Sequence, residues 1–272
     1  FLYLQQDKMS LRLAQFNRGK MHNAIPLEGV VVFAVPADKK EQVKADWNIF
    51  TGDVEDEYHI TDTGIQWSLE STDAEKVIPQ QISVNMVRAL QAVDNGVFAM
   101  CQDEDLAWLV ETSSNIASVQ SGEDSVVVVA SQRSNVMSNL ANMGNTVKAA
   151  FELAGAEVVQ NDGYPAWKTS PDSPLVKTAV DTYKHLYHKD PRVLGIHAGL
   201  ECGLFSQKYP DIDMVSFGPT LRHVHTPDEK LYIPSVQMVW DHLLLLLKNI
   251  PELNERTEHN TGMCFITGYR LW

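Results

Sequence analysis

The sequence has 272 residues, 44% of them hydrophobic and 21% charged, which is enough to bury one large or two ordinary domains and excludes a disordered or fibrous chain. Its 35 acidic residues outnumber 22 lysines and arginines, giving a net charge of −13, and this balance argues against nucleic acid as a partner. We expect no membrane span, because no apolar run is long enough, and no secretory signal. The three widely spaced cysteines form no CxxC pair and favour a reducing compartment.

The first part of the chain combines the alternation typical of half-buried strands with longer stretches of helical spacing. We expect strands at 9–16, 29–35 and 64–70, a hairpin formed by 115–120 and 125–130, and helices at 37–50, 79–93 and 134–153. Strands joined by short turns favour antiparallel pairing. This part is therefore predicted to be α+β.

The pattern changes near residue 160. A segment rich in Pro, Gly and Ser at 156–170 is typical of a linker between domains. Beyond it we expect helices at 173–187 and 235–250 and extended segments at 193–197 and 214–218. Such alternation favours parallel strands with crossover helices, so this part is predicted to be α/β, and the tail at 251–272 is expected to be irregular.

One histidine motif, HVHTPDE, follows the extended segment at 214–218. Loops at the carboxyl ends of parallel strands are where open α/β sheets place their ligands, which makes His225 a candidate metal ligand. Asp228 and Glu229 can orient its ring or begin a helical turn. An ordinary surface histidine explains the same pattern, because one histidine does not define a metal site.

Three other segments carry candidate binding groups. In IHAGLECGLF, the backbone around Gly199 can face a carboxylate or phosphate, or Gly199 and Gly203 can serve close packing. Arg133, at the end of the hairpin, can grip a carboxylate or remain a solvated surface side chain. The HNAIP segment, which begins at His22, follows the first strand. No GxSxG, Walker, GxGxxG or HExxH motif supports serine hydrolase or nucleotide chemistry.

Several motifs in order along the chain resemble the bacterial aminoacyl-histidine (Xaa-His) dipeptidases: FNRGKMHNAIP, GYPAW, HAGLECGLF, YPDIDMVSFGPT and HTPDE. The resemblance covers roughly residues 1–250 and implies a cytoplasmic, zinc-dependent exopeptidase. In such enzymes a lid domain is inserted into a catalytic α/β domain. Residues 1–157 would be most of the lid, residues 158–250 the second half of the catalytic domain, and residues 251–272 lie outside the match.

The resemblance also implies a role for each matching residue. His225 would ligate one of two zinc ions that share a bridging water, and Arg133 would hold the terminal carboxylate of a short peptide with the help of Asn23. Gly199 would present backbone donors, while His22 stands where a relative has arginine. We expect the catalytic glutamates and the remaining ligands to precede Phe1, so that this is a C-terminal portion that lacks its own catalytic residues.

Two other functions fit the same residues. A non-catalytic, lid-like module for binding or self-association, such as a homodimer, needs none of the missing ligands. A hydrolase of the same fold that cleaves N-acyl amino acids would differ only in its substrate.

Overall fold

A computed structural model of the chain describes two compact units. The described residues are 1–102, 104–161, 163, 165, 167, 173–195, 201–224, 226–250 and, for the backbone alone, 264–266. The first unit contains residues 1–98, 113–132 and 141–160, and the second contains residues 99–112, 133–140 and those from 161 onward.

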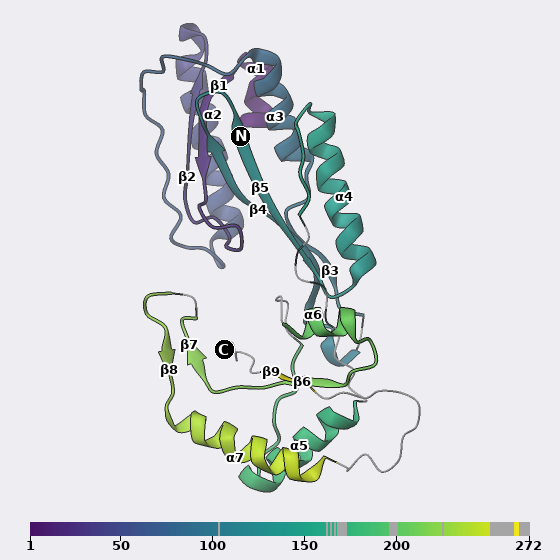
Figure 1. Cartoon of the computed structure of the whole chain (residues 1–272). Helices are drawn as coiled ribbons and strands as arrows, with labels where there is room; N and C mark the ends of the chain where they lie inside the picture. Colours follow the sequence, from purple (N-terminus) through teal and green to yellow (C-terminus); the bar gives the residue numbers. More distant parts are fainter. Residues whose placement is uncertain are drawn as a thin grey trace. The chain divides into compact units, whose positions relative to one another are not determined.

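A five-stranded sheet runs through the first part of the chain in the order β2-β1-β4-β3, with β5 also paired with β4 (Figure 1). Its strands are β1 (Arg12–Arg18), β2 (Gly29–Ala34), β3 (Gly96–Met100), β4 (Val110–Ser121) and β5 (Val126–Ser134). β1 is antiparallel to β2, with Arg18 opposite Gly29, and antiparallel to β4, where Arg18 lies opposite Val119. The expected antiparallel α+β arrangement is confirmed.

The core of the first unit lies between this sheet and two helices. The helices of this part are α1 (Leu2–Lys8), α2 (Lys40–Tyr58), α3 (Gln80–Ala92) and α4 (Met137–Leu153), with short 3₁₀ turns at Ala37–Lys39 and Glu104–Leu106. Leu13 of β1 and Val119 of β4 are fully buried in a cluster with residues of α3 and α4. The Leu13 backbone N–H donates to Ser83 Oγ of α3 over 2.9 Å, so a polar contact also fixes the helix on the sheet.

The second unit contains helices and short strands. Its elements are α5 (Pro174–Tyr187), α6 (Glu201–Lys208), β6 (Met214–Ser216), β7 (Leu221–Arg222), β8 (Lys230–Leu231), α7 (Pro234–Asn249) and β9 (Cys264–Ile266). β6 and β9 pair in parallel, and α7 lies between them in the sequence, which is the expected crossover arrangement. Leu175 and Ala179 of α5 pack with Leu246 of α7 in a buried cluster (Figure 1).

Two expected elements differ in the structure. Residues 64–70 form no strand, although Ile65, Trp67 and Leu69 alternate in burial with exposed neighbours. The ring of Trp67 packs edge-on against Trp47 of α2, with centroids 5.8 Å apart, so packing on a helix produces the alternation. Residues 193–195 also belong to no strand. Within the tail that we expected to be irregular, the backbone of residues 264–266 supplies β6 with its partner.

In the described part of the chain, no helix is both long enough and apolar enough to cross a membrane.

Candidate functional site

The loop between β1 and β2, residues 19–28, carries two of the expected substrate-binding residues. His22 and Asn23 are neighbours in a turn, and both are exposed to solvent. The loop closes at its base, where the Gly19 backbone N–H donates to the carbonyl of Glu28 over 3.3 Å. The sequence prediction of a turn after the first strand is confirmed, and it places these two side chains together.

Gly19 sets the direction in which this loop leaves the sheet. Its φ of 62° lies in the left-handed region, which glycine adopts without strain. A Cβ atom at this position would lie 2.1 Å from the carbonyl oxygen of Ala117 in β4. The backbone of the loop therefore approaches β4 more closely than any residue with a side chain would permit.

Arg133 lies on β5 and is partly buried. It belongs to the second unit, whereas His22 and Asn23 belong to the first. The structure therefore brings His22 and Asn23 together on one loop, whereas Arg133 lies near the end of β5, in the stretch that groups with the second unit.

A buried polar cluster includes Ser134, which directly follows Arg133, and sequence reasoning did not identify it. Glu111 is only 7% exposed, and its Oε1 accepts hydrogen bonds from Asn139 Nδ2 over 2.6 Å and from the Thr112 hydroxyl over 3.3 Å. The hydroxyls of Thr112 and Ser134 are 2.9 Å apart, and Ser134 Oγ accepts from the Val136 backbone N–H. These bonds join β4, the end of β5 and α4, so they fix the backbone next to Arg133.

The signal for this Glu111 cluster was present as a run of polar residues, ETSSN, inside a strand-like segment. Buried polar groups are almost always hydrogen-bonded, so such a run indicates partners on a neighbouring strand. Which partners they are depends on the register of β4 and β5.

The HVHTPDE motif forms the tight connection between β7 and β8. The backbone N–H and hydroxyl of Thr226 both bond to the carbonyl of His223, at 3.2 and 2.7 Å, and the Asp228 N–H donates to Thr226 Oγ1. The side chains of Asp228 and Glu229 are exposed. His225 and Gly199, the expected metal ligand and backbone donor, lie outside the described residues.

Two of the quoted motifs meet in the second unit. A Cβ atom on Gly203 of α6 would lie 2.2 Å from the carbonyl oxygen of Pro165, in the GYPAW segment. Trp167 of the same segment packs on a buried cluster of Cys202 and Met214. Gly203 therefore serves close packing, and part of the segment expected to be a linker is packed on α6.

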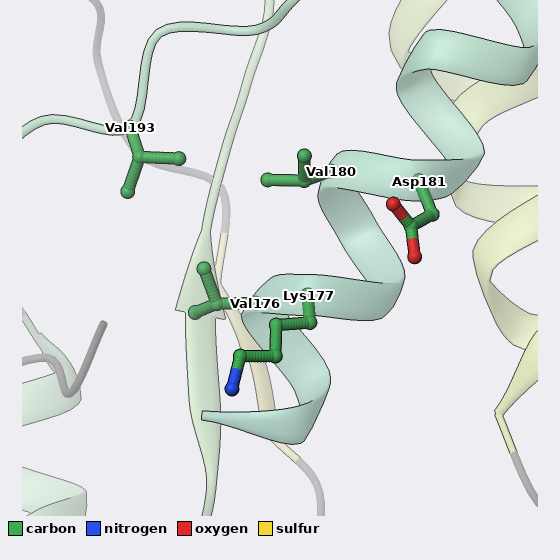
Figure 2. A pocket seen from close by; sticks show the side chains of 5 residues that line it. All are labelled: Val176, Lys177, Val180, Asp181 and Val193. Atoms are coloured by element: carbon green, nitrogen blue, oxygen red, sulfur yellow. The ribbon is translucent and has the colours of Figure 1, made fainter. Parts of the chain in front are cut away.

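A shallow depression of about 320 Å³ lies on α5. Figure 2 shows its apolar lining of Val176, Val180 and Val193, with Lys177 and Asp181 as its polar groups. None of the expected site residues lines it. Within the described ranges, no group of three or more His, Cys, Asp or Glu side chains is placed to hold a metal ion.

The described residues thus combine helices with an antiparallel sheet, and one loop of that sheet presents a histidine and an asparagine to solvent. Residues 28–249 match the peptidase family M20/M25/M40, and the chain belongs to this family. The expected resemblance and the expected fold class are thereby confirmed.

Two relatives show where in that family the chain lies. It is 35% identical over 253 residues to the cytosol non-specific dipeptidase of Escherichia coli (strain K12), a match that covers 92% of this chain and 52% of that protein. It matches the crystal structure of aminoacylhistidine dipeptidase from Vibrio alginolyticus with a TM-score of 0.82 and 35% identity, over 93% of this chain and 52% of that one. The chain thus spans about half the length of these relatives.

Proposed function

We propose that the chain is part of a dipeptidase that hydrolyses short peptides, Xaa-His dipeptides among them, in the cytoplasm. The observation that carries the proposal is the 35% identity to two dipeptidases over more than nine tenths of the chain. A match of this extent is not confined to one segment of the chain.

In this proposal several groups of the chain bind the substrate. Arg133 grips the terminal carboxylate of the peptide, because a guanidinium matches a carboxylate with two parallel hydrogen bonds. The Glu111 cluster supports this role by fixing the strand ends around Arg133. Asn23 and His22, exposed on their loop, assist in binding, and the backbone at Gly199 supplies further donors.

Zinc is the metal that family membership favours, with His225 as one ligand. Zinc held by three protein ligands lowers the pKa of a coordinated water to about 7. The described residues do not fit such an ion by themselves, since they contain no group of three ligands. We therefore assign to this chain the binding and orientation of the substrate.

We further infer that residues 1–157 form most of a lid domain and residues 158–250 the second half of a catalytic domain. Two observations support this division: the last stretch of the first compact unit ends at residue 160, close to the boundary, and the antiparallel sheet before it differs from the parallel pairing of β6 and β9. Residues 99–112 and 133–140 depart from the division, because they group with the second unit.

The experiment is an assay of the purified protein that contains this chain, with Xaa-His dipeptides and N-acyl amino acids as substrates. Its metal content is measured in the same preparation. We expect turnover of the dipeptides and bound zinc. Turnover of N-acyl amino acids alone would replace the substrate class, and an inactive protein that self-associates would favour the non-catalytic module.

A further inference from the structure

The tip of the loop that carries His22 and Asn23 has little apolar packing to define its shape. Met21, Ile25 and Leu27 are all exposed, Leu27 almost completely at 99%. A loop without buried side chains opens easily unless polar contacts hold it. The conformation of His22 and Asn23 therefore depends on hydrogen bonds to the loop backbone.

Two side chains of β4 supply such bonds. Gln120 Nε2 donates to the carbonyl of Gly19 over 2.7 Å and holds the base of the loop. Asn115 Nδ2 donates to the carbonyl of Ala24 over 2.9 Å and holds its tip. The Ala24 carbonyl belongs to the peptide unit between Ala24 and Ile25, so the bond from Asn115 holds the backbone one residue beyond Asn23, the expected substrate-binding residue.

β4 is a firm support for this contact. Both sequence neighbours of Asn115 are buried, Ser114 and Ile116, each at 3% exposed. Ser114 Oγ accepts from Gln132 Nε2 of β5, and the Ile116 backbone N–H donates to Asn95 Oδ1 over 2.8 Å. The amide of Asn115 therefore projects from a backbone that is held on both sides.

We propose that Asn115 is a positioning residue for substrate binding: its side-chain amide holds the Ala24 peptide and thereby sets the orientation of Asn23. The contact itself is independent of the function proposed above, and only its consequence for substrate rests on that function. All residues concerned belong to the first unit.

The hydrogen bond from Asn115 to the Ala24 carbonyl is called the tether below. The first measurement detects it without using activity. Lys20 has an 85% exposed side chain, so trypsin can cleave after it once the loop opens. We expect Asn115→Ala to speed cleavage at this bond about fivefold, the effect of losing a hydrogen bond of ordinary strength. Asn85→Ala is the matched control, because Asn85 Nδ2 donates in the same way to the carbonyl of Ala154 over 3.1 Å, away from the loop.

The second measurement detects the consequence for substrate. In the enzyme that contains this chain, Asn115→Ala should raise the KM for a dipeptide about threefold to tenfold and change kcat less, while Asn85→Ala changes neither. In an Asn23→Ala background, Asn115→Ala should raise KM little further, because both changes act through one residue. If Asn115→Ala does not fold, Asn115→Leu, which keeps the size and lacks the donor, replaces it.

The outcomes separate the two proposals. Equal cleavage at Lys20 in the two single variants would overturn the tether. A full KM effect that persists without Asn23 would overturn the role of Asn115 in orienting Asn23. Absence of dipeptide turnover in the unsubstituted enzyme would refute the proposed function instead, and the cleavage rates would still decide on the tether.

Discussion

Ser173 and Asp213 share a short hydrogen bond: the Ser173 hydroxyl donates to Asp213 Oδ1 over 2.6 Å. Ser173 is also the N-cap of α5, where its Oγ accepts from the Val176 backbone N–H, and Asp213 Oδ2 accepts from the Leu175 N–H. Two N–H groups that a helix start leaves without intrahelical partners are satisfied in this way. The pair thus ties the start of α5 to the segment that leads into β6.

Ser173→Ala should lower the free energy of unfolding by about 1 kcal/mol, the usual loss when an N-cap side chain is removed. Urea denaturation followed by circular dichroism measures the difference. Ser206→Ala serves as the control, because that hydroxyl bonds only locally, to the carbonyl of Gly203 within α6. Equal losses of unfolding free energy in the two variants would show that the N-cap contributes no more to stability than a local hydroxyl bond within a helix.

Gly19→Ala should be among the most damaging small substitutions in the first unit. It combines a φ of 62° with a Cβ placed 2.1 Å from the Ala117 carbonyl oxygen, and we expect a loss of about 2 kcal/mol or more. Gly52→Ala is the contrast, since Gly52 lies within α2 with nothing near its Cβ, and it should stabilise by up to about 1 kcal/mol. Thermal unfolding of the two variants tests the difference in sign.

His242 gives the second unit a defined pH dependence. Its Nε2 lies 2.8 Å from the Ala179 carbonyl, and its ring packs against Tyr183 and Phe217. Burial lowers the pKa of His242 below its usual 6.5, while the bond to Ala179 opposes this effect. The folded state therefore binds fewer protons than the unfolded state when the pH falls below about 6.5.

The contribution of the neutral His242 to stability should be complete above pH 7 and decline as the pH falls from 6.5 toward the lowered pKa. Urea midpoints between pH 5 and 8 should fall less steeply on the acid side in His242→Gln than in the unsubstituted protein. His185→Gln, a change of an exposed histidine on α5, gives the background dependence.

Arg133→Lys should weaken substrate binding more than it weakens metal binding, because a single ammonium replaces a planar guanidinium. We expect the KM for a dipeptide to rise about tenfold or more at unchanged zinc content, measured by steady-state kinetics and metal analysis. An unaltered KM would show that Arg133 does not bind the substrate.

His225→Ala should reduce zinc content and activity together in the enzyme that contains this chain, since loss of one of three or four ligands weakens a zinc site strongly. Metal analysis after dialysis measures occupancy directly. His223→Ala, two residues away, is the natural comparison. Full zinc occupancy in His225→Ala would contradict the proposed ligand role.

Much of the first unit could be predicted because its strands follow a simple rule. Residues 9–13, which lead into β1, alternate between the core and the surface, with Met9, Leu11 and Leu13 buried. The segment between β1 and β2 carries ordinary turn signals. The same rule failed at Trp67, where alternation reflects packing on the helix residue Trp47. Alternation in a sequence therefore indicates that one side of a segment is buried. It does not indicate whether a neighbouring strand or a helix buries that side.

The candidate site could be predicted only in part, for a related reason. His22 and Asn23 are neighbours in the sequence and lie in one turn, so their proximity could be predicted from the sequence. Asn115, by contrast, meets Ala24 across 91 positions of chain, and only the pairing of β4 with β1 makes that contact. Long-range polar contacts of this kind carry no local pattern.

The approach of Gly203 to Pro165 limits how this sequence can diverge. An added methyl group at position 203 would collide with a backbone oxygen, which position 165 presents whatever its side chain. No second substitution at 165 can therefore restore the fit, and position 203 should tolerate glycine alone in a saturation library. Tolerance for larger residues is instead expected at helix surfaces such as that around Gly52.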